Sequence, residues 1–333
     1  MDQRIRDRYS DQILQQALEA YQVQTEEAQE LDSFESYIYQ IQRKGGEGIL
    51  RITHSMRRTP DLIRGELDWI QRLHQGGAGV SLPLRSHENR LVEVFPDGAG
   101  GIFIAAAFEK APGEPHRGQE WPGSLLGEYG RQIGRMHYLA TTYQPADLDW
   151  KRPDWDDPIH LDAVAFIPEK EIRDRYWEAT ARIQALPRDG GAFGLIHRDP
   201  HRGNFFVDQS GGITFFDFDD SSYSWFVEDI ALILFYAVMG QEDPEEFIHR
   251  FLDGFLPGYF SAYPLEDKWF REIPAFMKLR ELDLYAVIHR SFDVENLTDP
   301  WCQWYLEGRK ERLVQGLPYL EFDFSSLKVQ DYR

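Results

Sequence analysis

The stretch LIHRDPHRGNFFV, Leu195–Val207, places a dense group of polar side chains between two short apolar runs. Within eight positions it contains two histidines, two arginines, an aspartate and an asparagine: His197, Arg198, Asp199, His201, Arg202 and Asn204. The flanking runs are rich in β-forming residues and predict strands on both sides. A solvated turn between two strands is the simplest interpretation of such a loop.

A second interpretation comes from the spacing of the oxygen-bearing side chains. Asp199 and Asn204 lie five positions apart, and Asp217 follows thirteen positions after Asn204, at the end of another predicted strand. Phosphoryl transfer from ATP needs a carboxylate to accept the proton of the attacking hydroxyl, and oxygen ligands to hold Mg²⁺ against the phosphates. A tight loop carrying Asp and Asn, facing a strand end that carries Asp, supplies this set of groups.

The same spacing occurs in protein kinases, whose catalytic loop reads H-R-D-L-x-x-x-N and is followed by D-F-G. Here HRDPHRGN and FFDFDD stand at the corresponding places. Upstream, Arg51 lies in GILRIT, where the kinase strand V-A-I-K has its phosphate-contacting lysine. Glu66 lies in the next predicted helix and would pair with that cation, although a surface glutamate on an amphipathic helix is the alternative. Ile49 lies on the same strand face as Arg51 and would pack against the adenine ring.

The order of the predicted elements indicates that the chain has a sheet-rich first part and a mainly helical second part. The first part, residues 1–108, is expected to be a small β-sheet with one inserted helix, and a Pro/Gly break at Lys110–Pro115 follows it. After the break helical patterns dominate, except around residues 193–219. The predicted elements are a helix at 5–21, a hairpin within 36–55, a helix at 59–77, strands at 90–95 and 101–109, and a helix at 124–140.

These motifs together resemble the aminoglycoside phosphotransferase / choline kinase-like family, a branch of the protein-kinase-like fold, over residues 31–236. The markers are GILRITHS, IRGELDWIQRLHQGG, GRQIGRMH, IHRDPHRGNFFV and FFDFDDSSYSWFVEDIA. The resemblance implies an α+β, two-lobed fold with a small antiparallel-sheet N-terminal lobe and a mainly helical C-terminal lobe. It places the nucleotide-binding lobe at 1–108, the hinge at 109–113, and the catalytic and substrate-binding lobe at 114–333.

The resemblance also assigns roles to individual residues. Asp199 would be the catalytic base, Asn204 and Asp217 the Mg²⁺ ligands, and Asp229 the brace of the catalytic loop. The nucleotide, ATP with GTP left open, would be held by the following residues: Arg51, Glu66, Ile49, Ser33, Phe108, Glu109, Lys110 and His201. Among these, Ser33 belongs to the segment that would cover the phosphates, and Phe108, Glu109 and Lys110 belong to the hinge that would hydrogen-bond the adenine.

Three features depart from the usual pattern. Arg51 replaces lysine, no G-x-G-x-x-G precedes the hairpin, and the family loop H-G-D-x-H-x-x-N here has Arg198 and Pro200. Only eleven residues separate Asp217 from Asp229, which leaves no room for the activation segment that controls protein kinases. A small hydroxyl-bearing acceptor is therefore favoured. The alternatives are a Ser/Thr protein kinase and a non-catalytic nucleotide-binding pseudokinase.

The amino-acid composition limits the classes of molecule that the protein is expected to bind. The 333-residue chain has a net charge of −20, and residues 109–333 hold 24 basic and 40 acidic residues. Such a charge disfavours nucleic acid and anionic membranes and would attract a cationic acceptor, although acidic charge often serves solubility alone. The absence of an 18-residue apolar run, the charged N-terminus and the single Cys302 predict a cytoplasmic protein that spans no membrane. The oligomeric state and the identity of the acceptor stay open.

Two smaller predictions concern surface and core. The basic spot SMRRT, residues 55–59, is interpreted as a solvated turn. Trp301, Trp304 and Tyr305 follow helical periodicity and are predicted to lie mostly in the core, with a substrate cage as the alternative for one of them.

Overall fold

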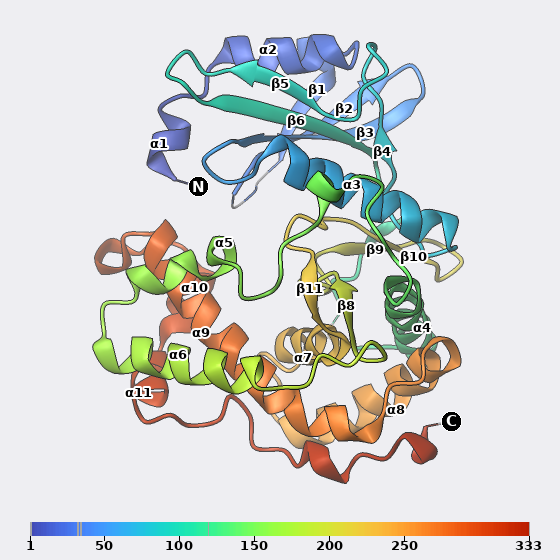
Figure 1. The fold of residues 1–333 in the computed structure, drawn as a ribbon, viewed down its shortest axis with the longest axis vertical. Helices are drawn as coiled ribbons and strands as arrows, with labels where there is room; N and C mark the ends of the chain where they lie inside the picture. The colour runs from blue at the N-terminus through green and yellow to red at the C-terminus, as the bar shows by residue number, and fades with distance from the viewer. Residues whose placement is uncertain (1, 32, 34, 119, 333) are drawn as a thin grey trace. The chain divides into compact units, whose positions relative to one another are not determined.

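The computed structural model describes residues 2–31, 33, 35–118 and 120–332 (Figure 1). The chain divides into two compact units, each assembled from segments that are separated in the sequence. Unit 1 comprises Met1–Pro115, Thr142–Arg152 and Phe205–Asp219, and unit 2 comprises His116–Thr141, Pro153–Asn204 and Asp220–Arg333. The lobe boundaries expected from the sequence, with a hinge at 109–113, stay a prediction.

Unit 1 is built on an antiparallel sheet of six strands in the order β1-β2-β3-β6-β4, with β5 also paired to β6. The strands are β1 (Ala28–Leu31), β2 (Tyr37–Arg43), β3 (Gly46–His54), β4 (Pro83–Leu84), β5 (Glu93–Pro96) and β6 (Ile102–Glu109). The predicted hairpin is confirmed as β2–β3, in which Arg43 pairs with Gly46 across the turn. The predicted strands at 90–95 and 101–109 are confirmed as β5 and β6.

One face of this sheet is covered by α2 (Asp11–Ala20), which lies beside β5 in Figure 1. Ala17 and Leu18 of α2 pack with Leu50 and Ile52 of β3, and all four side chains are fully or almost fully buried. Strand alternation sends Leu50 and Ile52 to this apolar face and leaves the residues between them for the other face. The apolar contact therefore fixes the register that presents Arg51 on the face opposite α2.

The N-terminal helical pattern is interrupted in the structure. The predicted single helix at 5–21 is two helices, α1 (Gln3–Arg6) and α2, because Ser10 adopts an extended conformation before α2 begins. The extended residue lets α2 start in a new direction while Ile5 and Ile13 both reach the apolar cluster. The short strand β1 was not predicted.

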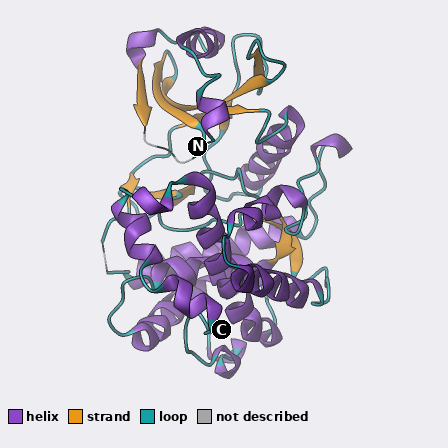
Figure 2. Ribbon diagram, turned by 90° about the vertical axis from the view of Figure 1, so that its left-hand side faces the viewer, coloured by secondary structure: helices purple, strands orange, loops and turns teal. Residues whose placement is uncertain are grey.

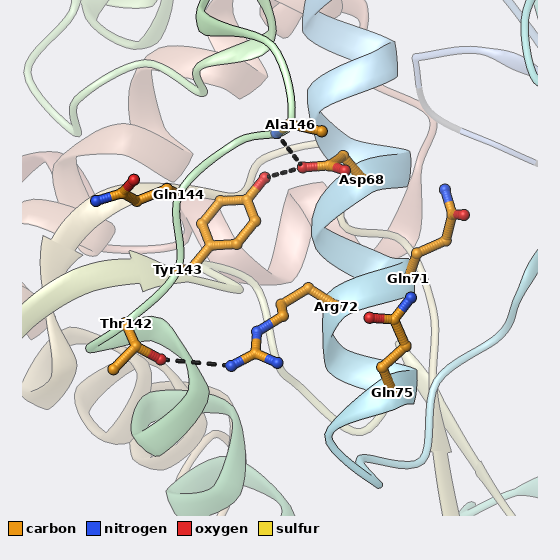
Figure 3. Close-up of a pocket in the computed structure, with 8 residues that line it drawn as sticks. All are labelled: Asp68, Gln71, Arg72, Gln75, Thr142, Tyr143, Gln144 and Ala146. Atoms are coloured by element: carbon orange, nitrogen blue, oxygen red, sulfur yellow. Dashed lines mark hydrogen bonds between the residues drawn. The ribbon is translucent and has the colours of Figure 1, made fainter.

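Helix α3 (Pro60–Gln75) begins and ends as predicted, with the Thr59 hydroxyl accepting the Leu62 N–H at 3.2 Å. The segment 142–152 returns to this helix (Figure 3). The Asp68 carboxylate accepts the Tyr143 hydroxyl at 2.7 Å and the Ala146 N–H at 3.1 Å. Gly65 permits the approach, because a Cβ at this position would lie 2.0 Å from the Trp150 carbonyl oxygen.

A second sheet in unit 1 has the order β10-β9-β7, formed by β7 (Glu114–Pro115), β9 (Phe205–Val207) and β10 (Ile213–Phe215). The expected Pro/Gly break at Lys110–Pro115 thus ends in a strand rather than in a free linker. Gly113 has φ +89°, and a Cβ there would lie 2.1 Å from the Val207 carbonyl oxygen. A glycine is therefore required where the chain meets β9.

Unit 2 is mainly helical, as the purple elements in Figure 2 show. Its two strands, β8 (Phe193–Ile196) and β11 (Ser222–Trp225), pair with each other antiparallel. Its α-helices are α4 (Gly123–Ala140), α5 (Pro158–Leu161), α6 (Lys170–Gln184), α7 (Phe226–Ala237), α8 (Pro244–Ala262), α9 (Ile273–Ser291), α10 (Pro300–Leu306) and α11 (Arg309–Val314). The α+β composition expected from the sequence is confirmed.

The 3-10 helices are short connections between these elements. They are η1 (Thr25–Glu27), η2 (Leu148–Trp150), η3 (Asp162–Phe166), η4 (Asp267–Glu272), η5 (Val294–Asn296), η6 (Phe324–Ser326) and η7 (Val329–Asp331). Within the part of the chain that is described, no helix is both long and apolar enough to cross a membrane.

The packing of α4 against α8 depends on glycines and provides a test of the fold. A Cβ at Gly130 would lie 2.0 Å from the Phe255 carbonyl oxygen of α8, whereas a Cβ at Gly127 meets nothing closer than 3.8 Å. We expect Gly130→Ala to lower the free energy of unfolding by about 2 kcal/mol, because the two helix backbones must separate. Gly127→Ala is expected to be neutral, or stabilising by up to about 1 kcal/mol, because alanine favours the helix. Melting temperatures of both variants check this; equal values would contradict the close approach.

Candidate active site

One face of β3 carries the residues expected to meet the nucleotide. Ile49 pairs with Phe108 across the β3–β6 ladder, and the Arg51 guanidinium lies 5.2 Å from the centroid of the Phe108 ring. Ile49 and Phe108 are half-buried, while Arg51 is buried. The structure therefore brings these three predicted residues together on the face of the sheet opposite α2.

Arg51 forms a two-pronged ion pair with Glu66 of α3. Its Nη1 and Nη2 atoms lie 2.9 and 2.5 Å from the two carboxylate oxygens, and the Glu66 side chain is fully buried. Burial acts to lower the pKa of Arg51, but Glu66 and Asp219 outweigh it and raise the pKa. The predicted pairing is present, and the fork geometry explains how arginine stands at a position where kinases have lysine.

Asp219, the last residue of DFD, is held by arginines of unit 1. Arg57 Nη1 lies 2.5 Å and Arg58 Nη2 3.2 Å from its Oδ2 atom, and Arg152 donates to its carbonyl oxygen at 2.6 Å. Burial acts to raise the pKa of Asp219, but the arginines outweigh it and hold the pKa well below its usual range. The solvated-turn interpretation of SMRRT was therefore wrong for Arg57 and Arg58, because both bind this buried carboxylate.

The anchored Asp219 leaves Asp217 presented differently. The Asp217 side chain is 56% exposed, and its φ of 62° lies in the left-handed region, which aspartate tolerates better than most residues. Its Oδ1 atom lies 3.9 Å from Arg51 Nη1. Asp217 thus carries an accessible carboxylate on a turn that the Asp219 ion pairs fix.

The expected hinge is already part of the hydrogen-bonding pattern of unit 1. The Glu109 N–H donates to the Leu82 carbonyl at 2.7 Å, and the Glu109 carbonyl accepts the Ser81 hydroxyl. The Lys110 ammonium lies 3.0 Å from Glu47 Oε2. The Glu109 N–H is therefore already paired, whereas its carbonyl oxygen keeps a second lone pair.

The segment expected to cover the phosphates is only partly described. Ser33 is exposed, and its hydroxyl donates to the Ser36 carbonyl, which closes a local turn. Asp32 and Phe34 lie outside the described residues. Glu35 forms an ion pair with Arg57, so this segment is linked to the same arginine that binds Asp219.

In unit 2, Asp199 lies within a set of hydrogen-bond donors. The Asn204 Nδ2 atom donates to the Asp199 carbonyl at 2.8 Å and to its Oδ2 at 3.0 Å, and His201 Nε2 lies 3.4 Å from Oδ2. Arg280 Nη2 lies 2.5 Å from Oδ1. Burial acts to raise the pKa of Asp199, but His201 and Arg280 outweigh it and lower the pKa. Asp199 is therefore an ionised, oriented carboxylate.

The catalytic-loop backbone is held by Asp229 of α7. Its two carboxylate oxygens accept the N–H groups of His197 at 3.1 Å and of Arg198 at 2.7 Å, and His137 of α4 contributes a further contact at 3.1 Å. Arg198 has φ 66°, a strained conformation for a residue with a large side chain. The brace expected for Asp229 is thus present, and it holds a non-glycine residue where the family loop usually has glycine.

The Arg198 side chain forms an ion pair with Glu228, in which Nε lies 3.3 Å from Oε1. Burial raises the pKa of Glu228, and Arg198 opposes that shift. The neighbouring charges let unit 2 accommodate an arginine inside the loop, which explains how this departure from the family pattern is tolerated.

Sequence reasoning missed Arg280 and Tyr236. Arg280, on α9, lies 81 residues after Asp199, and no local motif marks it. The Tyr236 hydroxyl of α7 accepts from Arg280 Nε at 3.0 Å and from Nη2 at 2.5 Å, and the His201 ring lies 4.6 Å from the Tyr236 ring. No signal in the sequence distinguishes Arg280 from the other charged residues of α9, such as Lys278, Glu281 and Asp283.

The core prediction for the C-terminal aromatic residues was right for one residue of three. Tyr305 is fully buried, whereas Trp301 and Trp304 are 44% and 47% exposed. Helix α10 is only seven residues long, so one buried stripe accommodates Cys302 and Tyr305 and leaves both tryptophans outside it.

The described residues supply the separate parts of a phosphoryl-transfer site. Unit 1 carries a buried cation on a strand, its glutamate partner and an exposed carboxylate; unit 2 carries an oriented carboxylate and an amide beside it. No group of three or more His, Cys, Asp or Glu side chains within the described residues is arranged to hold a metal.

Comparisons with known proteins agree with this chemistry. The model of the phosphotransferase enzyme family matches residues 27–265. Amicoumacin kinase of Bacillus subtilis (strain 168) is 34% identical over 326 residues, which cover 96% of both proteins. A solved amicoumacin kinase in complex with AMP-PNP, Ca²⁺ and a ligand abbreviated Ami has a TM-score of 0.90 at 35% identity, covering 97% of this chain and 99% of that one.

A microcompartment-associated aminopropanol kinase has a TM-score of 0.71 at 21% identity, covering 92% of this chain and 98% of that one, and supports the fold alone. The family match spans well over half of the sequence, and the Bacillus relative is similar along almost its whole length. The chain belongs to the phosphotransferase enzyme family: it has the two-lobed protein-kinase-like α+β fold and is a kinase that uses an alcohol group as acceptor.

Proposed function

We propose that this kinase transfers the γ-phosphate of ATP, with Mg²⁺, to a hydroxyl group of a small molecule such as an aminoglycoside or an amino alcohol. The observation that carries the proposal is the Asp199 carboxylate, which Asn204 and Arg280 orient. The complex of the solved amicoumacin kinase with AMP-PNP and Ca²⁺ supports a nucleotide and a divalent ion. A preference between ATP and GTP stays open.

Asn204 and Asp217 are the proposed metal ligands, and their chemistry fits Mg²⁺. The Asn204 Nδ2 atom is committed to Asp199, which leaves Oδ1 as the atom for a metal. Along the chain, Asn204 directly precedes Phe205 of β9, and Asp217 follows Phe215, the last residue of β10, by two positions. When bound, the ion would neutralise charge that develops on the transferred phosphoryl group.

The roles of the other side chains follow from their charge. Arg51, fixed by Glu66, would contact the phosphates, and His201 would lie next to the base and the γ-phosphate. The acceptor oxygen forms a bond to the γ-phosphorus while the bond from that phosphorus to the bridging oxygen breaks, and ADP leaves with the electron pair. Asp199 takes the acceptor proton. A weakly basic carboxylate is sufficient, because the transition state is loose and catalysis consists mainly of positioning.

The segment between Asp217 and Asp229 supports a small acceptor over a protein. Its described residues run directly into β11, which pairs with β8, and then into α7. Only residues 218–221 of this stretch lie outside strand and helix, which is too short a loop for an activation segment that docks a protein. A cytoplasmic reaction is favoured by the use of ATP and by the single cysteine, Cys302, which is buried and free.

A cationic group on the acceptor is proposed from the negative charge of residues 109–333, which would concentrate cations by long-range attraction. Several of the acidic residues in this part of the chain are already used within the protein and contribute less to the attraction of a cation. Asp157, Asp243, Asp293 and Asp299 accept N–H groups at the starts of α5, α8, η5 and α10. These carboxylates stabilise helices, so the attraction rests on the net charge rather than on a particular cluster.

Asp199→Asn is expected to lower kcat by about 10²–10⁴-fold, because the amide keeps the shape of the loop but accepts no proton. The KM for ATP should change far less. Steady-state kinetics of ADP release, with the melting temperature as the control for folding, check this. A change confined to the KM for ATP would mean that Asp199 is not the base.

Asp217→Ala is expected to abolish Mg²⁺-dependent turnover, because removing the carboxylate leaves the metal charge uncompensated. The fold should survive, since this side chain is more than half exposed. ADP release is measured across a Mg²⁺ titration, and the melting temperature is measured alongside it. Activity within a few-fold of the wild type would exclude Asp217 as a ligand.

The salt dependence of kcat/KM tests the cationic acceptor. Attraction by the net charge must weaken as ionic strength rises, because the Debye length shrinks to about 10 Å at 0.1 M. We expect kcat/KM for a cationic acceptor to fall between 0.02 and 0.3 M NaCl, while a neutral acceptor, the control, stays unchanged. A flat profile for both would refute the charge argument and leave the kinase assignment intact.

A further inference from the structure

Arg280 of α9 links the Asp199 carboxylate to Tyr236 of α7. Its Nη2 atom lies 2.5 Å from Asp199 Oδ1, and its Nε and Nη2 atoms donate to the Tyr236 hydroxyl. Asp283, a further residue of α9, also faces the guanidinium. Because the partners of Arg280 belong to different elements, its contact with Asp199 depends on how α7 and α9 are held together.

The residue after Arg280 is held by the C-terminal part of unit 2. The Glu281 side chain is fully buried, and Arg309 Nη1 of α11 lies 2.6 Å from its Oε1 atom. The Glu281 carbonyl accepts the Tyr305 hydroxyl of α10 at 2.9 Å, and Arg309 Nε donates to the Tyr305 carbonyl at 3.3 Å. Helix α10 thus lies beside α9 (Figure 1), and both the main chain and the side chain of Glu281 are bound. Lys278 forms a second ion pair with Glu281.

The residue before Tyr236 is held by the same part of the chain. The Tyr319 ring stacks on the Phe235 ring with the centroids 4.2 Å apart, and its hydroxyl donates to the Phe235 carbonyl at 3.1 Å. The Arg309 guanidinium carbon lies 4.6 Å from the centroid of the Tyr305 ring and 5.7 Å from that of the Tyr319 ring. Arg309 therefore connects the contacts that hold α9 to the contact that holds α7. We call Tyr305, Arg309 and Tyr319 the C-terminal clamp.

We propose that Arg309 is a positioning residue, which acts on the proposed base, Asp199, through Arg280. The inference rests on the proposed role of Asp199. The C-terminal clamp holds the residue that follows Arg280 on α9 and the residue that precedes Tyr236 on α7. The two helices are then fixed to each other where Arg280 meets both the Tyr236 hydroxyl and the Asp199 carboxylate. A displacement of about 1 Å at a reacting group can cost about 10²-fold in rate, so contacts away from the base can matter for catalysis.

A purely structural role is the alternative, because removing one partner of a buried ion pair lowers the stability of the fold. The two roles differ in how the effect of Arg309 depends on Arg280. A residue that acts through Arg280 has nothing left to act on once Arg280 is replaced. A loss of stability does not depend on the identity of that residue. A double-mutant cycle therefore separates the two roles.

The cycle combines Arg309→Met with Arg280→Met. ADP release is measured with ethanolamine or kanamycin as acceptor, and with water as acceptor where neither alcohol is used. We expect Arg309→Met to lower kcat by about tenfold and to change the KM for ATP by less than about twofold. Arg309→Lys keeps the charge and should recover part of kcat. In the Arg280→Met background, Arg309→Met should lower kcat by less than about twofold. Equal losses in both backgrounds would overturn the proposal.

Nuclear magnetic resonance tests the contact without an acceptor. The Nε–H signal of Arg280 is identified in the nitrogen–proton correlation spectrum as the one that Arg280→Met removes. This hydrogen is bonded to the Tyr236 hydroxyl, and Arg309→Met should speed its exchange with solvent by about tenfold or more. Lys310→Met, at a surface ion pair with Glu169, is the matched control and should change neither exchange nor kcat. Unchanged exchange in Arg309→Met would refute the positioning role.

A second variant keeps the test decisive if Arg309→Met does not fold. Tyr319→Leu removes the stack on Phe235 and leaves the ion pairs of α9 in place. It should lower kcat several-fold in the wild-type background and have little effect in the Arg280→Met background. No loss of kcat, or the same loss in both backgrounds, would contradict the proposal. Melting temperatures of all variants are measured alongside the kinetics.

Asp199→Asn distinguishes a failure of this inference from a failure of the proposed function. If Asp199→Asn leaves kcat unchanged, Asp199 is not the base, while solvent exchange at Arg280 still decides whether Arg309 positions that residue. If Asp199→Asn loses activity and the losses from Arg309→Met are equal in both backgrounds, the base assignment stands and the role of Arg309 is refuted.

Discussion

The buried carboxylate of Asp229 is the constraint on which the catalytic loop depends. It accepts two consecutive backbone N–H groups, from His197 and Arg198, and thereby holds Arg198 in a left-handed conformation. A non-glycine residue in that region costs about 1–3 kcal/mol, which the surrounding contacts must offset. The turn is what directs Asp199, the next residue, toward Asn204 and Arg280. Without this brace the loop would relax, and Asp199 would lose the orientation in which it meets Asn204 and Arg280.

A comparable arrangement operates in unit 1, where charge rather than backbone strain sets the geometry. Arg51, Arg57 and Arg58 surround Asp219, and Glu66 completes the pairing of Arg51. Removing one partner of such a buried network leaves an uncompensated charge, which is strongly unfavourable. The network therefore defines the position of the DFD turn. Asp217 can remain exposed because Asp219, two residues later, carries the structural role.

The sequence allowed the local parts of this molecule to be predicted. The β2–β3 hairpin, α3 with its Thr59 cap, the Arg51–Glu66 pair and the Asp199–Asn204 loop each have a signal within a few residues, in periodicity, turn residues or motif spacing. Features set by distant contacts were missed. Arg57 and Arg58 look like a solvated basic turn until Asp219, 161 residues after Arg58, is placed beside them. The break between α1 and α2 depends on how Ile5 and Ile13 fit one apolar cluster, which helical periodicity does not encode.

The contrast between local motifs and distant contacts also explains why the sequence predicts the reaction but not the acceptor. The groups that define phosphoryl transfer lie in compact motifs, because they must act on a nucleotide common to the whole family. Residues of helices such as α7 and α9 lie outside these motifs and are free to vary on one scaffold. Arg280 illustrates this, since its contacts with Asp199 and with Tyr236 of α7 are made by tertiary packing and leave no trace in local spacing. Because Arg280 contacts the Asp199 carboxylate itself, the orientation of that carboxylate depends on α9 as well as on the loop that carries Asp199.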